Sequence, residues 1–303
     1  MIKNYIESFR PGTLLLALAN TITGSALAYA DGGFRWPVFF LAAATTLLLQ
    51  ILANMANDYG DFKHGKDTDE RIGPRRMLQS GMISAKAMLR AIIIVVLLTV
   101  VAGFFLIYEG FSNIDISSAL PGIIVFGLLG LAAITAAIKY TVGKNPYGYK
   151  AMGDVFVFIF FGLIGVLGTY FLHTGMLRWS LLLPAAAIGM LSVGVLNLNN
   201  LRDFEQDKST GKRTMVVALG LSNARKYHIF LLMGAFLLVS FYTLLESKCA
   251  WQWIFWASFP QVFRNIRVVQ RFKDHRQLFP ELKLLSMASL FFALLFAAGL
   301  LIC

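Results

Sequence analysis

Long apolar stretches separated by short polar connections dominate the chain. A membrane-spanning helix needs roughly 20 apolar residues, and about nine stretches approach this length. They lie near residues 12–30, 36–57, 85–107, 118–138, 153–172, 179–199, 227–246, 250–266 and 284–302. The eighth is the weakest, because it is short and ends in Arg264. The pattern predicts an all-α integral membrane protein in which residues 1–303 form a single transmembrane domain.

The composition agrees with this pattern and narrows the class of protein. Hydrophobic residues make up 57% of the chain and charged residues 14%, with a mean hydropathy of +0.68. A soluble domain is closer to a quarter charged, so most soluble enzymes, disordered chains and coiled coils are excluded. The two cysteines, Cys249 and Cys303, lie in or beside apolar runs and predict neither a disulfide framework nor a metal site.

The positive charges test the predicted layout. If the N-terminus is cytoplasmic, 24 of the 27 Lys and Arg residues fall in cytoplasmic connections or at the helix ends beside them. The outer connections keep only Arg35, Arg178 and Lys248. Because cytoplasmic loops of membrane proteins are enriched in Lys and Arg, this accounts for the net charge of +11 without a nucleic-acid partner. We expect a multi-pass protein of the cell (inner) membrane, with the longest polar connections, 58–84 and 200–226, in the cytoplasm.

The start of the chain has an alternative interpretation. Lys3 and Arg10 precede an apolar run that ends in Ser25-Ala26-Leu27-Ala28, as in a secretory signal peptide. The alternation of charge depends on the first helix being retained in the membrane. It therefore favours a first transmembrane helix over a cleaved leader.

Two polar segments begin inside apolar helices and leave them through Asn and Asp. They are Asn54, Asp58 and Asp61 after the second predicted helix, and Asn199, Asp203 and Asp207 after the sixth. Spacings of three or four residues place side chains on one helix face if the helix persists through the segment. Each segment would then present a stripe of oxygen ligands.

Clustered carboxylates repel one another unless a cation lies between them. Oxygen ligands without a His or Cys set suit Mg²⁺, which completes its coordination with phosphates and water. Basic residues follow each stripe: Arg71, Arg75 and Arg76 follow the first, and Lys208, Lys212 and Arg213 follow the second. Carboxylates for a metal followed by cations for phosphate oxygens are what a diphosphate site requires.

Simpler interpretations exist for each segment alone. A charged connection at a membrane surface is often a solvated loop, and Asn within an apolar helix often forms an interhelical hydrogen bond. Two such segments that both begin at membrane depth favour a functional role. His64 is read as a loop residue rather than a ligand, because the Asp oxygens suffice.

A third cytoplasmic connection, 139–154, is rich in Gly and aromatic residues. It begins with Lys139 and Tyr140 and ends with Asp154 at the start of an apolar helix. Asp154 suits either a helix N-terminus, where the dipole favours a carboxylate, or a substrate-binding position. The residues leave both roles open.

Across essentially its full length, the chain resembles the UbiA family of intramembrane aromatic prenyltransferases. Asn57-Asp58-Tyr59-Gly60-Asp61 is similar to the family's Asn/Asp-rich motif, and 203–207 to its second, Asp-x-x-x-Asp motif. The 4-hydroxybenzoate branch usually carries another Asp at the position of Gly65, whereas this chain has Asp67 two residues further on. This stretch and 140–149 look like the 1,4-dihydroxy-2-naphthoate polyprenyltransferase branch instead.

The resemblance implies about nine helices around a central cavity that the two acidic loops cap on the cytoplasmic side. It also implies Mg²⁺ as cofactor, a polyprenyl diphosphate donor and 1,4-dihydroxy-2-naphthoate as acceptor. The acceptor carboxylate would be lost, giving demethylmenaquinone, diphosphate and CO₂. This is an activity of menaquinone biosynthesis.

The residues then take hypothetical roles. One Mg²⁺ would be held by Asp58, Asp61 and Asp67, and another by Asp203 and Asp207. Diphosphate contacts are expected from Asn54, Asn57, Asn199, Arg71, Lys139, Lys212 and Arg213. Asp154 or Tyr140 would orient or deprotonate the acceptor hydroxyl.

Three rival functions remain at this point. Within the family, the alternative is a prenyltransferase for another aromatic acceptor such as 4-hydroxybenzoate. A cation-coupled transporter also has buried carboxylates, but it would more naturally place them near the middle of broken helices. A membrane diphosphatase would use the same metals without an acceptor site.

Overall fold

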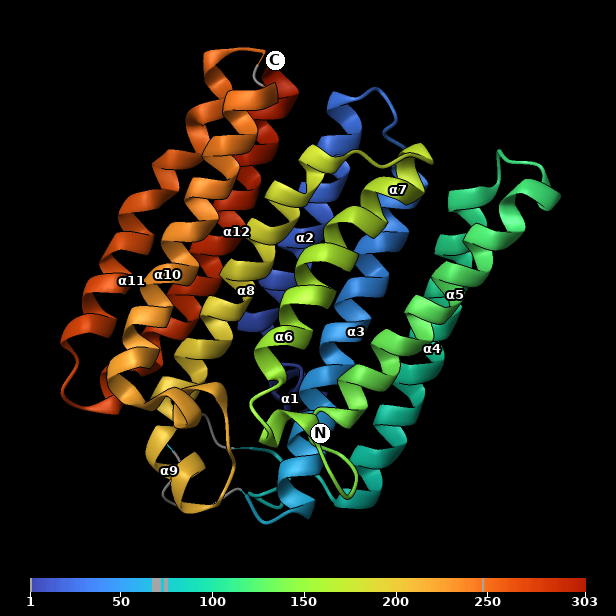
Figure 1. Ribbon diagram of the computed structural model, residues 1–303. Coiled ribbons are helices and arrows are strands. Elements are labelled where there is room, and N and C mark those ends of the chain that lie inside the picture. Colours follow the sequence, from blue (N-terminus) through green and yellow to red (C-terminus); the bar gives the residue numbers. More distant parts are fainter. Residues whose placement is uncertain (1, 67–71, 74–75, 247) are drawn as a thin grey trace.

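The computed structural model describes residues 2–66, 72–73, 76–246 and 248–303, which form a bundle of helices lying side by side (Figure 1). The first part contains α1 (Ile2–Ser8), α2 (Pro11–Ala30), α3 (Trp36–Lys63), α4 (Ala85–Phe111), α5 (Ile116–Lys139), η1 (Tyr147–Tyr149), α6 (Gly153–Val157), the π-helical η2 (Phe158–Gly168) and α7 (Thr169–Thr174). The second part contains η3 (Trp179–Leu181), α8 (Leu182–Arg202), α9 (Phe204–Ser209), α10 (Met215–Glu246), η4 (Ala250–Ser258), α11 (Phe259–Arg271), η5 (His275–Leu278) and α12 (Phe279–Ile302).

The number of crossings agrees with the sequence prediction. Among the described residues, 8 helices are long and apolar enough to span a membrane. The weak eighth stretch is split into η4 and α11, which together pack against α12 and α10 as a further crossing. The N-terminus and the C-terminus lie at opposite ends of the bundle (Figure 1), as an odd number of crossings requires. The prediction of an all-α membrane protein with about nine spanning segments is confirmed.

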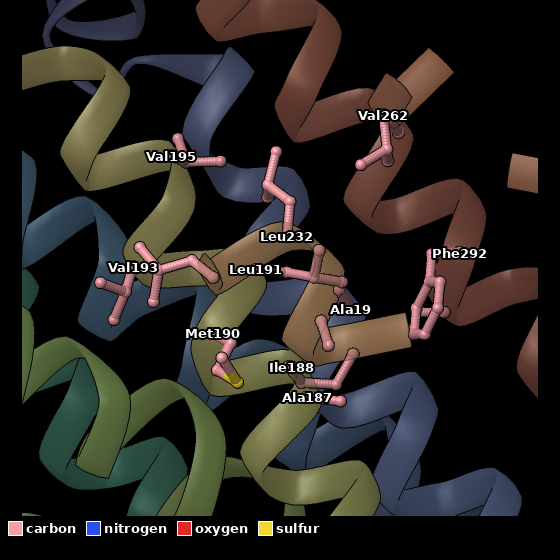
Figure 2. Packing of buried hydrophobic residues seen from close by; sticks show 14 of the residues in the cluster. Ala19, Ala187, Ile188, Met190, Leu191, Val193, Val195, Leu232, Val262 and Phe292 are labelled. Carbon is pink, nitrogen blue, oxygen red and sulfur yellow. The ribbon is translucent and has the colours of Figure 1, made fainter. Parts of the chain in front are cut away.

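The bundle is packed unevenly. The largest core cluster joins α2, α8, α10, α11 and α12, and Figure 2 shows Leu191 of α8, Leu232 of α10 and Phe292 of α12 within it. In the most apolar part of α8, 78% of the residues are buried, against 6% in α5. The first membrane-spanning helix, α2, packs extensively on α12 and α3, which supports its role as an integral part of the bundle. The side chains of α5 therefore mostly face lipid or the cavity described below.

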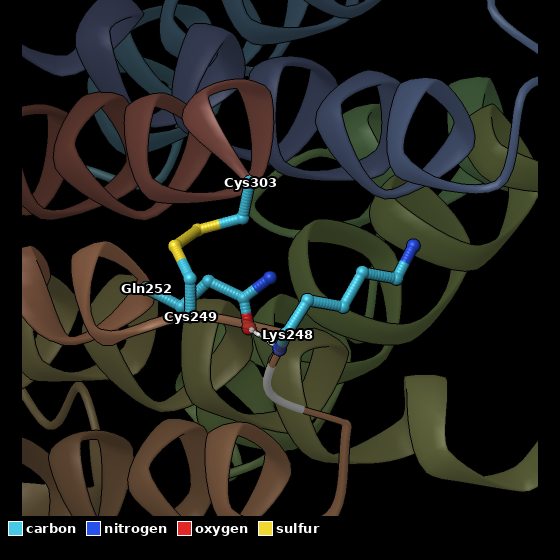
Figure 3. Close-up of a disulfide and its surroundings, with 4 residues drawn as sticks. All are labelled: Lys248, Cys249, Gln252 and Cys303. Carbon is cyan, nitrogen blue, oxygen red and sulfur yellow. Dashed lines mark hydrogen bonds between the residues drawn. A yellow bond between two sulfur atoms is a disulfide. The ribbon is translucent and has the colours of Figure 1, made fainter.

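A disulfide joins Cys249, before η4, to Cys303 at the end of α12 (Figure 3), with their Cα atoms 5.8 Å apart. It lies at the end of the bundle away from α1 and α9. The expectation of no disulfide framework therefore missed this bond. A separation of 54 residues gave no sign of the pairing, because it arises only when α12 returns beside η4.

Candidate active site

The first acidic segment is part of a single helix. α3 continues without a break through Lys63, so Asn54, Asp58 and Asp61 lie on one buried face, as their spacing predicts. The second segment is different, because α8 ends at Arg202. Asp203 leaves the helical backbone between α8 and α9. The predicted helical stripe therefore exists in the first segment and is interrupted in the second.

A glycine brings the third connection against the first acidic segment. A Cβ atom on Gly60 would lie 2.4 Å from the hydroxyl oxygen of Thr141, so only glycine permits this approach. The Thr141 hydroxyl donates a hydrogen bond to the carbonyl oxygen of Ala56 at 3.0 Å. Beyond this contact, the hydroxyl of Tyr149 donates to an Asp61 carboxylate oxygen at 2.5 Å. The first acidic segment and the third connection thus meet at Asp61.

Two arginines neutralise the first pair of aspartates. The Arg76 guanidinium lies 2.7 Å from Asp61 and 3.5 Å from Asp58, and its side chain is only 5% exposed. Arg10 reaches Asp58 from the turn before α2, where its backbone adopts a left-handed conformation. A buried carboxylate needs such partners, because desolvation without a counter-charge is costly.

A lysine joins the two acidic segments. The ammonium of Lys212 lies 3.4 Å from Asp61 and 3.9 Å from Asp207. Arg202 forms two parallel hydrogen bonds with Asp203, at 2.7 and 2.6 Å. Asp58, Asp61 and Asp207 therefore form one buried cluster with basic side chains between them. Asp203 lies beside it, because its carbonyl oxygen accepts a hydrogen bond from the Asp207 N–H at 2.8 Å.

A cavity of about 320 Å³ lies above this cluster, between α2, α3, α4, α5, η2 and α8. Its walls are mainly apolar, with Phe156, Phe160 and Phe161 on one side. Polar lining residues include Arg10, Asn54, Asn57, Arg76, Tyr140, Asn199 and Lys212. The side-chain oxygen of Asn57 is buried and has no hydrogen-bond partner among the described residues. The arrangement is an apolar chamber whose polar mouth faces the acidic cluster.

The three Asn residues of the predicted site, Asn54, Asn57 and Asn199, differ in their hydrogen-bond partners. The Asn54 amide donates to the Phe9 carbonyl oxygen and the Thr13 hydroxyl at 2.8 and 2.9 Å, so it fixes the entry into α2. The Asn199 oxygen accepts a hydrogen bond from Arg202 at 3.0 Å. Of these three Asn residues, Asn57 is the one whose buried side-chain oxygen has no hydrogen-bond partner among the described residues.

Several other predicted residues lie elsewhere. Lys139 and Arg213 are exposed and do not line the cavity, so their contact with a diphosphate stays a prediction. Asp154 is buried at the start of α6, but it also lies outside the cavity lining. Asp67 and Arg71 fall outside the described residues.

Three residues of the cluster were absent from the predicted site: Arg10, Tyr149 and Arg202. Arg76 was expected only as one of the basic residues that follow the first acidic stripe. Arg202 stands next to Asp203 in the sequence, which is a usable signal. Tyr149 lies 88 residues from Asp61, and Arg10 lies 48 residues from Asp58. Nothing in local spacing indicates such contacts.

The donor set suits a hard divalent cation held by few protein ligands. Within the described ranges, no group of three or more His, Cys, Asp or Glu side chains is arranged to hold a metal ion. Aspartate pairs and an Asn oxygen are present, and Mg²⁺ is usually bound by one or two carboxylates together with substrate phosphates and water. The residues therefore fit an ion that arrives with a phosphate ligand.

Tyr140 lines the cavity and lies close to the carboxylates of Asp154 and Asp61. Burial raises the pKa of Tyr140 far above its usual range, and the neighbouring Asp154 carboxylate raises this pKa further. The phenol consequently stays protonated at neutral pH and acts as a hydrogen-bond donor. The side chain of Tyr227 in α10 lies close to the Asp154 carboxylate.

Comparison with known proteins agrees with this geometry. The sequence pattern of the UbiA prenyltransferase family matches residues 17–295. The chain belongs to the UbiA prenyltransferase family. It is 43% identical to a 1,4-dihydroxy-2-naphthoate octaprenyltransferase of Haemophilus influenzae over 99% of this chain and 96% of that protein. An Escherichia coli protein of the same name is 42% identical, over 98% of this chain and 94% of that protein.

A solved structure shares the fold. A UbiA homolog from Archaeoglobus fulgidus, described as bound to GPP and Mg²⁺, superposes with a TM-score of 0.66. The likeness covers 98% of this chain and 99% of that chain at 17% identity, so it supports the fold of the family.

Proposed function

We propose that the protein transfers a polyprenyl group from polyprenyl diphosphate to 1,4-dihydroxy-2-naphthoate, with release of diphosphate and CO₂. The observation that carries the proposal is the buried cluster of Asp58, Asp61 and Asp207, which Arg76 and Lys212 join at the polar mouth of an apolar cavity, with Asp203 one helical turn before Asp207. The whole-length relatives named for this acceptor support the choice of naphthoate.

The aspartates Asp58, Asp61, Asp203 and Asp207 would hold Mg²⁺. Bound Mg²⁺ supplies positive charge that stabilises the departing diphosphate. Asp67 remains a predicted further ligand. The Mg²⁺ reported for the Archaeoglobus homolog supports a divalent ion.

The basic residues of the cluster have a second role in this proposal. Arg10, Arg76 and Lys212 pair with the aspartates and also line the cavity. They are placed to transfer their contacts from carboxylate to phosphate oxygens when the donor enters. Arginine suits this exchange, because its planar guanidinium matches phosphate in two parallel hydrogen bonds.

The reaction itself balances without a further reactant. The bond between the allylic carbon and the diphosphate oxygen breaks, and both electrons leave with the diphosphate. The ring carbon that bears the carboxylate forms the new C–C bond. The bond to the carboxylate carbon then breaks, CO₂ leaves, and its electron pair restores the aromatic ring in the quinol form of the product.

Tyr140 and the cavity walls control this chemistry. As a protonated phenol on the cavity wall, Tyr140 would donate a hydrogen bond to an acceptor oxygen rather than remove its proton. Asp154 would act behind Tyr140 as a positioning residue. Phe156, Phe160 and Phe161 exclude water, which would otherwise quench the allylic cation.

We also propose that the acidic cluster faces the cytoplasm. The basic connections and α9 lie at one end of the bundle, as the positive-inside rule requires, and the Cys249–Cys303 disulfide lies at the other (Figures 1 and 3). Disulfides persist on the oxidising side of a membrane, so both features support the same orientation.

A product assay tests the proposed function. Purified protein in lipid would receive a polyprenyl diphosphate, Mg²⁺ and naphthoate labelled on its carboxylate. Mg²⁺-dependent labelled CO₂ together with a prenylated naphthoquinone is expected, and EDTA should abolish both. Product from 4-hydroxybenzoate alone would reject the acceptor. Diphosphate release without any prenylated product would indicate a diphosphatase.

A further inference from the structure

The outer side of α11 carries a basic groove that the proposed reaction does not use. Arg264, Arg267 and Arg271 line it at spacings of three and four residues, with Phe263 and Phe272 beside them. The groove measures about 580 Å³. The opposite face of α11 is buried in the bundle through Val262, Asn265, Ile266 and Val269. The three guanidinium groups therefore lie on the free face of a helix at the edge of the bundle.

These arginines are poorly neutralised by the protein. Arg264 donates to Glu281 at 3.0 Å, but its side chain remains 63% exposed. Within the described part of the chain, Arg267 and Arg271 form no ion pair with an acidic side chain. The Arg267 guanidinium lies 5.4 Å from the centre of the Phe263 ring, which orients it along the groove.

The position of the groove indicates the source of its counter-ion. Arg271 ends α11 on the side of the bundle that carries α9 and the acidic cluster (Figure 1). Seven residues separate Arg264 from Arg271, or about 10 Å along a helix. The polar head-group layer is roughly 5–7 Å thick on each side of a bilayer, so a stretch of this length at the end of a helix extends through it. The anions available to a lipid-facing helix at this depth are lipid phosphates.

We propose that the α11 arginine groove binds the head group of an anionic phospholipid. Arg267 and Arg271 would hold phosphate oxygens, and Phe263 would contact the first carbons of an acyl chain. This inference is independent of the proposed reaction, because it uses neither the cavity nor the acidic cluster.

A chain of buried hydrogen bonds connects the groove to α8. Glu281, the partner of Arg264, accepts a hydrogen bond from Asn265 at 3.0 Å, and Asn265 contacts His228 at 2.8 Å. His228 in turn contacts Asn197 of α8 at 3.2 Å, two residues before Asn199. An occupied groove would therefore stabilise the packing of α11 and α12 on α10 and α8.

Lipid binding to the full-length protein in detergent tests this site. Native mass spectrometry and thermal unfolding would compare phosphatidylglycerol with phosphatidylcholine of the same acyl chains. We expect the wild type to retain phosphatidylglycerol preferentially and to unfold at a higher temperature with it. The R267Q/R271Q variant should bind phosphatidylglycerol about 30-fold more weakly, because it loses two charges at an anionic surface.

The control is R276Q, which removes an exposed arginine paired with Asp274 outside the groove. It should bind phosphatidylglycerol like the wild type. Equal retention of the two lipids by the wild type, or equal loss in R276Q and R267Q/R271Q, would overturn the proposal. Displacement of phosphatidylglycerol by geranyl diphosphate would assign the groove to the prenyl donor and would also overturn it. Both arginines are exposed, so we expect the variants to fold, and circular dichroism checks this.

Discussion

The two acidic segments use different backbones to reach the same cluster. In the first, α3 stays helical and presents Asp58 and Asp61 from one rigid face. In the second, the helix breaks at Asp203, and Asp207 approaches from the short helix α9. The first shares its cations with other segments, whereas Asp203 is held by its own neighbour, Arg202. Equivalent carboxylates therefore differ in how firmly the fold positions them and in what their loss disturbs.

The largest effect is expected at Asp61, where both segments and the third connection meet. Asp61→Asn removes the carboxylate that Arg76, Lys212 and Tyr149 share. We expect kcat to fall about 100- to 1,000-fold, the range seen when one preorganised electrostatic group is lost. Steady-state prenylation with a detergent-stable protein measures this. The control is Asp274→Asn, an exposed aspartate that should keep normal activity.

Asp203→Asn sharpens the comparison at the second segment. Arg202 holds the Asp203 side chain through two hydrogen bonds from the adjacent position in the chain. We expect a folded protein with kcat reduced about 100-fold and an unfolding temperature closer to the wild type than that of Asp61→Asn. Near-normal prenylation by this variant would remove Asp203 from the proposed metal ligands.

Gly60→Ala tests whether the position of the α3 face depends on the close approach of Thr141 to Gly60. The new methyl group would meet Thr141 at 2.4 Å, within a segment that carries Tyr140 and leads to Tyr149. We expect a destabilisation of about 1–3 kcal/mol, typical of overpacking, and lower activity. Gly127→Ala in α5 is the matched control, because nothing lies within 4 Å of its added Cβ. Equal stability of the two variants in thermal unfolding would contradict the packing argument.

Tyr140→Phe should have a moderate effect on turnover and a small one on donor binding. The variant loses a hydrogen-bond donor to the acceptor, so we expect kcat to fall about 10- to 100-fold. Because burial raises the pKa of Tyr140, its hydroxyl stays protonated in the wild type, and it loses its proton only in strongly alkaline solution. The pH profiles of the variant and the wild type should therefore run parallel between about pH 6 and 9. A basic limb that disappears in the variant would show that Tyr140 acts as a base.

The smallest effect on activity is expected at the disulfide, far from both acidic segments. Cys249→Ser should leave kcat unchanged. In intact cells, the wild-type cysteines should resist a membrane-impermeant maleimide until a reductant is added, and then react from the outside. Labelling without reductant, or labelling only after the membrane is opened, would contradict the proposed orientation.

The sequence allowed the membrane helices and the acidic segments to be predicted, because both depend on local patterns. Apolar length defines the spans, and spacing places Asp58 and Asp61 on one face of α3. Charge alternation gave the parity of the crossings. The family motifs then indicated which aspartates belong together.

The contacts that complete the site could not be predicted in this way. Arg10 reaches Asp58 only because its backbone turns into a left-handed conformation before α2. The helix breaks at Asp203 without a proline or glycine there that would predict the break. That Lys139 ends α5 on an exposed face also follows from packing and not from its charge. Long-range approach and side-chain direction are set by tertiary packing rather than by local spacing.

The central claim is that both acidic segments act on one diphosphate. The most direct test measures the Mg²⁺-dependent affinity of an unreactive prenyl thiodiphosphate for the wild type, Asp61→Asn, Asp207→Asn and the double variant. If both segments bind the same diphosphate, the effects of the two substitutions are coupled. The double variant should then bind the thiodiphosphate only slightly more weakly than the single variant with the lower affinity. Losses that simply add would mean that the segments act independently, and would contradict the account.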